Sequence, residues 1–317
     1  MCNSLACEMI KRKDLEKRTR KIFHEIHKTQ GNNSTIYNRL LSLLNTDYLK
    51  VEENFFHGKI CLDAGCGSNA YATRSMLKMG AKRVYAFDLD KTILETAPKF
   101  LNDFKGKYEL SVGNILEMKY KNNFFDFCHC AGVLHHTANV FKGLKELARV
   151  TKIGGILYVS TYGKGGLLRE ITSFLRKKYQ NDDEFKNFID NLNEKDLVNL
   201  FKWVTSVMAL HGDNIAKNIS LSLIKELFDK DLVLTIKDRI TAPVYHENSE
   251  EELVNWLKNN GFSKIERLTR YPKYNNIRRF LSPLYFEYDS KYSRLLCGSG
   301  VVQIKAVKIK DARHNQK

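Results

Sequence analysis

The chain has 317 residues, 43% of them hydrophobic, which is enough for one large domain or for one domain with substantial additions. Its formal net charge of +16 is compatible with a nucleic-acid partner, but Lys residues occur along the whole chain, so we interpret the charge as a general compositional bias. There is no apolar run of about 18 residues and no signal-peptide core, so the sequence predicts a cytoplasmic protein without a membrane span.

The seven cysteines are an odd, scattered set that does not resemble a disulfide framework, which favours a reducing compartment. Cys128, His129 and Cys130 are consecutive and suggest a metal site at first. Alternate residues of a strand share one face, however, and no second ligand pair follows at zinc-like spacing. We therefore predict buried thiols and no metal site.

Residues 1–58 are predicted to form an N-terminal helical cap. The segment is highly charged at first and becomes amphipathic from Ser34, which is a suitable N-cap residue for a helix.

Residues 59–70, KICLDAGCGSNA, predict a buried strand, a glycine turn and the start of a helix. Gly65 and Gly67 would let the backbone approach a ligand closely, with the free N–H groups of the helix start directed toward it. The spacing Gly65-x-Gly67-x-x-Ala70 also fits the dinucleotide fingerprint. Asp63 would repel a pyrophosphate but would suit a cationic group such as the ammonium of an amino acid, which favours a nucleoside that carries an amino acid.

Four more strands are predicted before residue 163. Residues 83–87 end at Asp88, where a carboxylate could accept hydrogen bonds from both hydroxyls of a ribose, and residues 108–112 end at Gly113 and Asn114. The apolar segments FFDFCHCA and KIGGILYVST supply the next two strands, and the first of them ends at Ala131. All these strand ends would line one carboxyl edge of a doubly wound sheet.

Five motifs in this order resemble the class I methyltransferases that use S-adenosylmethionine, and specifically the ubiquinone/menaquinone-type methyltransferase domain. They lie within residues 59–161 and read LDAGCG, YAFDLD, GNILEM, FDFCHCAGVLHHT and RVTKIGGILYVS. The resemblance implies an α/β fold, a doubly wound seven-stranded Rossmann-like sheet whose last strand is antiparallel. It also implies S-adenosyl-L-methionine as the cofactor.

The resemblance assigns cofactor contacts to residues at the strand ends. Asp63 would hold the methionine amino group directly or through water, Asp88 with its neighbour Leu89 would take the ribose, and the Ala131 carbonyl would face the amino-acid end. Asn114 stands where the family commonly has Asp, and its amide oxygen can still accept a hydrogen bond from the adenine amino group, on which Ile115 would pack. Gly65 and Gly67 would give backbone clearance.

The rest of the chain adds a lid and completes the sheet. We predict the cofactor core at residues 59–162, an inserted helical lid at 163–240, the completion of the sheet at 241–310 and a basic tail at 311–317. Residues 249–257 predict a capped helix, and 263–270 and 300–308 predict the last two strands. The Tyr-rich, basic segment 271–295 is interpreted as an aromatic hairpin extension, with binding of an acidic acceptor or of RNA left open.

The chemistry that the resemblance implies is an in-line displacement that transfers a methyl group, here to a small-molecule acceptor, and positioning supplies much of the effect. If the acceptor is a hydroxyl, a general base helps, and the candidates are His135, His136 and Tyr162 at the carboxyl edge and His211 and His246 on the lid side. The resemblance favours a cofactor-wall and helix-capping role for His135 and His136 over the role of a base. An RNA methyltransferase, a non-catalytic binding module and an NAD-dependent oxidoreductase are alternatives, the last disfavoured by Asp63. The sequence makes no prediction about the oligomeric state.

Overall fold

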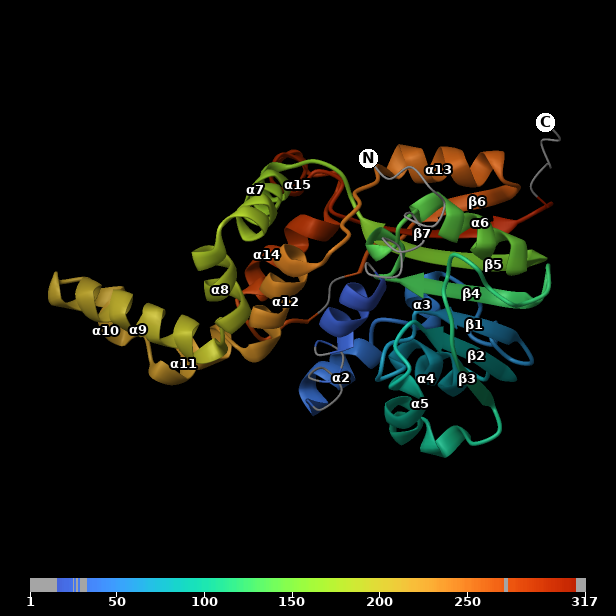
Figure 1. Ribbon diagram of the computed structural model, residues 1–317, viewed down its shortest axis with the longest axis horizontal. Helices are drawn as coiled ribbons and strands as arrows, with labels where there is room; N and C mark the ends of the chain where they lie inside the picture. Colours follow the sequence, from blue (N-terminus) through green and yellow to red (C-terminus); the bar gives the residue numbers. More distant parts are fainter. Residues whose placement is uncertain (1–15, 25, 27, 29–32, 271–272, 312–317) are drawn as a thin grey trace.

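In the computed structural model, which describes residues 16–24, 26, 28, 33–270 and 273–311, a seven-stranded sheet has the strand order β3-β2-β1-β4-β5-β7-β6 (Figure 1). The first five strands pair in parallel, and β7 is antiparallel to both β5 and β6. The predicted doubly wound sheet with an antiparallel last strand is therefore confirmed.

The strands form where runs of β-branched and aromatic residues predict them. Their bounds are β1 Ile60–Ala64, β2 Arg83–Asp88, β3 Tyr108–Val112, β4 Phe125–Ala131, β5 Thr151–Tyr162, β6 Phe262–Arg267 and β7 Val301–Lys308. In β1 every residue from Cys61 to Ala64 is buried, as expected for a central parallel strand that is covered on both faces. Five cysteines in the described part of the chain are free and buried, which confirms the predicted buried thiols for those positions; Cys2 and Cys7 lie outside it.

Each face of the sheet has its own apolar core. Leu144 and Leu147 of α6 (Val140–Val150) and Leu253 and Leu257 of α13 (Glu250–Asn259) pack against one face. The other face is covered by residues of α3 (Thr46–Leu49) and α4 (Tyr71–Lys78), among them Leu49 and Met76. The connection between β2 and β3 holds three short helices, α5 (Ile93–Thr96), η1 (Ala97–Phe100) and η2 (Asn102–Phe104).

The predicted lid is a run of helices that extends away from the sheet, with α9, α10 and α11 at its far end (Figure 1). The helices are α7 Leu167–Asn181, α8 Asp183–Asn191, α9 Glu194–Leu210, α10 Asn214–Asn218, α11 Leu221–Leu227 and α12 Lys230–Thr241. The helical patterns LLREITSFLRKK, EFKNFIDNL, KDLVNLFKWVTSVMAL and SLIKELFD in the sequence predict α7, α8, α9 and α11, whereas α10 and α12 were not predicted. None of the described helices is long and apolar enough to span a membrane.

The predicted N-cap of α13 is confirmed, whereas the N-cap of α2 lies one residue before the predicted one. Ser249 and Glu252 form a reciprocal capping box at the start of α13. Helix α2 (Ser34–Leu41) is capped by Asn33 and not by Ser34, because the Asn33 side chain accepts a hydrogen bond from the Ile36 N–H. The Tyr-rich segment is also different from the predicted hairpin: it contains the helices α14 (Arg278–Phe286) and α15 (Lys291–Cys297), and α15 packs on α7.

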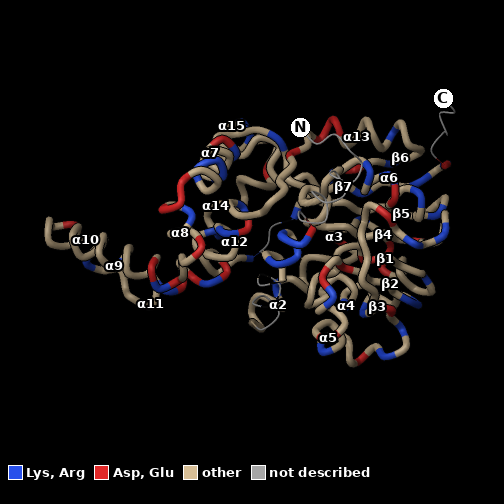
Figure 2. Tube along the Cα trace, in the orientation of Figure 1, with Lys and Arg blue, Asp and Glu red and all other residues tan. Residues whose placement is uncertain are grey.

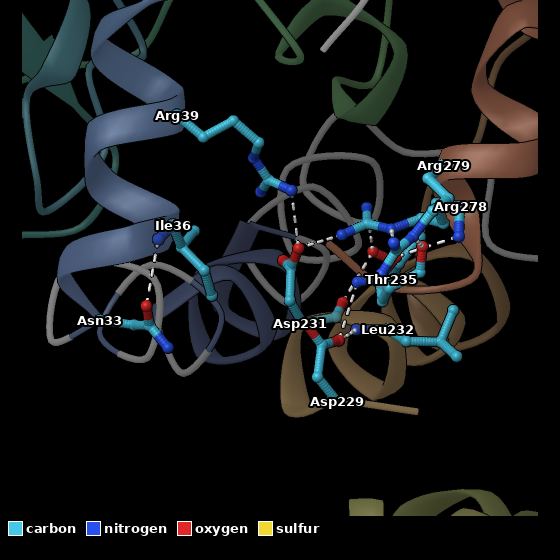
Figure 3. A network of polar contacts seen from close by, with 10 residues as sticks. Asn33, Ile36, Arg39, Asp229, Asp231, Leu232, Thr235, Arg278 and Arg279 are labelled. Carbon is cyan, nitrogen blue, oxygen red and sulfur yellow. Dashed lines mark hydrogen bonds and ion pairs between the residues drawn. The ribbon is translucent and has the colours of Figure 1, made fainter. Parts of the chain in front are cut away.

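A buried polar cluster joins the N-terminal helices, the lid and the C-terminal helices (Figure 3). Asp231 of α12 is 2% exposed and accepts hydrogen bonds from both Arg39 of α2 and Arg278 of α14. Arg278 also donates to Thr235, one turn further along α12. Segments far apart in the sequence are thereby held together beside the carboxyl edge of the sheet.

Candidate active site

A cavity of about 310 Å³ lies at the carboxyl ends of the central strands. Its walls come from the loops after β1, β2, β3 and β4, from the end of β5, from the helical residues 16–24 and from α12. Such a position, at the switch point of a doubly wound sheet, is where ligands of this fold class bind.

The glycine turn after β1 packs tightly against the β2 end. The N–H groups of Gly65 and Cys66 donate to the Phe87 carbonyl, and the Gly67 N–H donates to Asp88 Oδ2 at 3.0 Å. These three N–H groups are used within the protein and are not free for a ligand, whereas the prediction that N–H groups of the helix start are directed toward a ligand stays a prediction. Gly65 has φ = +80°, and a Cβ there would clash with the Val133 side chain, so the turn needs glycine at this position.

Asp63 lies behind the cavity wall. It is 1% exposed, its Oδ2 accepts from the Thr73 N–H and hydroxyl, and its Oδ1 accepts from His129 Nδ1 at 2.9 Å. Thr73 is in the first turn of α4, so Asp63 caps that helix from a distance. Asp63 and Gly67 are outside the cavity lining, and a role for Asp63 toward an ammonium group stays a prediction.

The other predicted cofactor residues are brought together on the cavity lining. They are Gly65, Asp88, Leu89, Asn114, Ile115 and Ala131. Asp88 Oδ1 also accepts from the Asp90 N–H, which fixes the carboxylate at the end of β2. The Asn114 oxygen accepts from the Leu116 N–H at 2.9 Å, and its Nδ2 donates to Glu16 Oε1 at 2.7 Å.

Two polar residues of the helical segment 16–24 reach the same end of the cavity, and sequence reasoning missed them. Besides Glu16 at Asn114, His24 Nδ1 lies 2.7 Å from Asp90 Oδ2. The sequence predicted that this charged segment belongs to a helical cap, but not which of its residues reach the cavity. These contacts join residues more than 60 positions apart, so no local pattern shows them.

The three predicted base candidates meet in one part of the cavity, which we call its inner end. His135 and His136, in η3 (Leu134–His136), and Tyr162, at the end of β5, all line it together with Asp238 of α12. The ring centroids of His135 and Tyr162 are 3.9 Å apart, and the Tyr162 hydroxyl donates to Asp238 Oδ2 at 3.0 Å. Asp238 was not predicted as a site residue because the sequence patterns did not predict α12, the helix that carries it.

Burial controls the protonation of these groups. Burial and the neighbouring positive charges lower the pKa of His135 well below its usual value, and burial also lowers the pKa of His136 although Asp238 opposes the shift. Burial raises the pKa of Tyr162 well above its usual value, so the phenol keeps its proton. Near neutral pH the two imidazoles are therefore available as neutral bases, and the phenol is not.

Comparison with known proteins agrees with this geometry. Residues 62–159 match the model of a family described as "Methyltransferase domain". The chain thus carries a class I methyltransferase domain. That domain covers β1 to β5, the strands whose ends form the cavity.

The names of the curated relatives of this methyltransferase domain refer to different acceptors. The chain is 32% identical over 110 residues to a malonyl-[acyl-carrier protein] O-methyltransferase of Serratia marcescens, covering 35% of this chain and 41% of that protein. It is 31% identical over 105 residues to a tRNA U34 carboxymethyltransferase of Campylobacter fetus, with 32% and 36% covered. It is 28% identical over 150 residues to a demethylmenaquinone methyltransferase of Geobacillus kaustophilus, with 44% and 61% covered.

The aligned part therefore spans only between 36% and 61% of the length of these relatives. The lid and the C-terminal helices lie outside the matched domain.

S-adenosyl-L-methionine is the cofactor of this class, and the cavity fits it. Asp88 presents a carboxylate suited to hydroxyl groups, and the apolar side chains of Phe87, Ile115 and Leu116 suit a flat ring. Gly132, at the end of β4, lines the cavity with φ = +77°, and a Cβ added there would meet nothing within 4 Å. That open space beside the backbone is room that a ligand can fill.

Proposed function

We propose that this chain transfers a methyl group from S-adenosyl-L-methionine to a small-molecule acceptor. The observation that carries the proposal is the continuity of one cavity, from Asp88 at the β2 end to the buried polar group of His135, His136 and Tyr162. When bound, the cofactor supplies a methyl group on a sulfonium, which an aligned acceptor atom can take directly.

The residues of the chain would bind, orient and exclude water. Asp88 and Leu89 would hold the ribose, Asn114 and Ile115 the adenine, and the Ala131 carbonyl the amino-acid end. Asp63 would hold the first turn of α4 and strand β4 in place through Thr73 and His129, and it would act on the methionine amino group directly or through water. The nearly complete burial of His135 and His136 supports a site from which water is largely excluded.

The C-terminal helices supply an argument against an RNA acceptor. Two rings beside these helices are covered by guanidinium groups: Tyr274 by Arg39 and Arg278, and Tyr288 by Arg267 at 3.6 Å from the ring centroid. These two rings are not free to stack on bases, whereas Phe280 and Tyr292, on the helices themselves, are exposed.

Three arginines of the same region are also engaged within the protein. Arg270 donates to the Leu43 carbonyl, Arg267 pairs with Glu250, and Arg279 pairs with Glu226. Lys and Arg are also spread along the chain with acidic residues between them (Figure 2). A phosphate backbone calls for a concentrated basic surface, so this distribution favours a small acceptor.

Calorimetric titration with S-adenosylmethionine and S-adenosylhomocysteine tests the proposal. Asp88→Ala should weaken binding by at least tenfold, because a hydrogen bond to a charged group contributes roughly 1.5–3 kcal/mol. Asp103→Ala is the matched control, since Asp103 is exposed and pairs with Arg74 on the surface. No binding by the intact protein would refute the proposal.

If the cofactor binds, labelled methyl transfer should be compared for phenols, small acids and RNA. Transfer to RNA alone would replace the small-molecule proposal by an RNA methyltransferase. Binding without transfer to any acceptor would indicate a non-catalytic adenosylmethionine-binding module.

A further inference from the structure

The inner end of the cavity contains polar atoms that the cofactor residues do not use. Asp238 Oδ1 and His135 Nδ1 are buried and have no hydrogen-bond partner among the residues that the structure describes. Unsatisfied buried polar atoms are costly, so a group of them beside a cavity indicates a ligand that completes their bonds.

The contacts of His136 define which of its nitrogen atoms is basic. Its Nδ1 lies 2.9 Å from the Val244 carbonyl, which can only accept, so Nδ1 carries the proton. In the neutral ring Nε2 is then an acceptor, and it lies 3.7 Å from Asp238 Oδ1. Two acceptor atoms therefore stand side by side and call for two hydrogen-bond donors.

Tyr162 cannot supply either donor. Its hydroxyl proton is already committed to Asp238 Oδ2 at 3.0 Å. Phe23, whose ring centroid is 4.6 Å from that of His136, adds an aromatic wall on the cavity lining. The two hydrogen-bond donors must then come from the bound molecule, which would lie against an aromatic wall of the cavity.

Three guanidinium groups determine which ligand charge is favoured at the inner end of the cavity. Arg169 lies 4.7 Å from the Tyr162 ring centroid, Arg176 lies 4.7 Å from the Tyr245 ring centroid, and Arg239 lies 5.8 Å from the Tyr162 ring centroid. Their positive field disfavours an ammonium group and stabilises an oxyanion. Hydroxyl donors of an acidic kind fit this field, and protonated amines do not.

We propose that Asp238 and His136 form the acceptor site, and that the acceptor is an aromatic molecule with two adjacent hydroxyl groups. This rests on the proposed methyl transfer. One hydroxyl donates to Asp238 Oδ1 and orients the ring, and the other donates to His136 Nε2. The second hydroxyl proton passes to Nε2 as its oxygen takes the methyl group, and the electron pair of the broken methyl–sulfur bond stays on sulfur. Asp238 then stabilises the imidazolium.

Binding of two chromophoric probes tests this assignment without relying on turnover. The protein is saturated with S-adenosylhomocysteine and titrated with para-nitrocatechol, which has two adjacent hydroxyls, and with para-nitrophenol, which has one. Wild type should bind the catechol at least tenfold more tightly, since the additional hydrogen bond is made to a charged group. The absorbance of the bound probe should also show more of its anion than the free probe at the same pH.

Two variants and one matched control separate the roles. Asp238→Asn retains an oxygen for the Tyr162 hydroxyl but removes the charge, and it should abolish the preference for the catechol. His136→Gln should weaken both probes and remove the additional anion. Asp190→Asn should change nothing, because Asp190 accepts a Tyr179 hydroxyl at 2.6 Å in the same way but on the exposed surface of the lid.

The outcomes are distinguishable from failure of the proposed function. If S-adenosylhomocysteine binds but wild type binds the two probes equally or not at all, this inference is overturned and the cofactor assignment stands. A catechol preference that survives Asp238→Asn, in a variant that still binds S-adenosylhomocysteine, overturns it as well. If S-adenosylhomocysteine itself does not bind, the proposed function fails first.

Discussion

Replacement of Gly132 by alanine gives a sharp test of where the cofactor lies. Gly132 has φ = +77° and lines the cavity, and an added Cβ would meet no protein atom within 4 Å. The methyl group of Gly132→Ala would therefore occupy cavity space without disturbing a neighbouring side chain. Gly106 is a matched control, because it has φ = +81° and equally open surroundings but lies outside the cavity lining.

The two substitutions should cost the same stability and differ in binding. A non-glycine residue in the left-handed region costs roughly 1–2 kcal/mol, which applies to Gly132→Ala and to Gly106→Ala alike. In the cofactor complex the alanine at position 132 would be overpacked, which costs roughly 1–3 kcal/mol. Binding should then be about five to 150 times weaker for Gly132→Ala and unchanged for Gly106→Ala.

Urea unfolding gives the first quantity, and calorimetric titration with S-adenosylhomocysteine gives the second. Wild-type affinity in a folded Gly132→Ala variant would refute the placement of the cofactor beside the β4 end. Equal weakening in both variants would show that backbone strain, and not lost space, is responsible.

Two further substitutions test the polar groups around the site. Asp231→Asn should lower the free energy of unfolding by about 3 kcal/mol in a urea titration, because it removes a nearly inaccessible carboxylate that pairs with both Arg39 and Arg278. Glu109→Gln, at an exposed ion pair, should lower it by less than about 1 kcal/mol. Equal effects of the two substitutions would contradict this prediction. The pKa of His135 in the folded protein is well below its value in the unfolded chain, so the unfolded chain binds the proton first as the pH drops. The free energy of unfolding should therefore fall below about pH 6.5, by up to roughly 1.4 kcal/mol per pH unit. In urea titrations between about pH 5 and 7.5, His135→Gln should reduce that slope.

The sheet could be predicted from the sequence because its signals are local. A run such as Ile60 to Ala64 is buried on both faces and ends directly at a glycine turn, so strand, turn and strand end are visible within a few residues. The same holds for Asp88 and Asn114, which follow their strands immediately. Residues placed in this way reach the cavity because the carboxyl ends of parallel strands share one edge.

The contacts of Asp63 could not be read in the same way. A carboxylate two residues before Gly65 indicates a ligand for a cation, but its partners in the structure are Thr73 and His129. Their proximity depends on how α4 and β4 pack beside β1, and no local pattern encodes it.

Helix α12 shows most clearly why Asp238 was not predicted as a site residue. Asp231 and Asp238 are seven residues apart, two helical turns, so they lie on one face of a helix whose Val233 and Ile240 are buried on another. An amphipathic pattern would assign the two aspartates to solvent. Both are instead used inside the protein, Asp231 toward Arg39 and Arg278, and Asp238 toward Tyr162 and the cavity. Because one helix face carries both the contact that holds the lid in place and the carboxylate proposed for the acceptor, displacement of the lid would take Asp238 away from His136, and acceptor binding should depend on the Asp231 cluster.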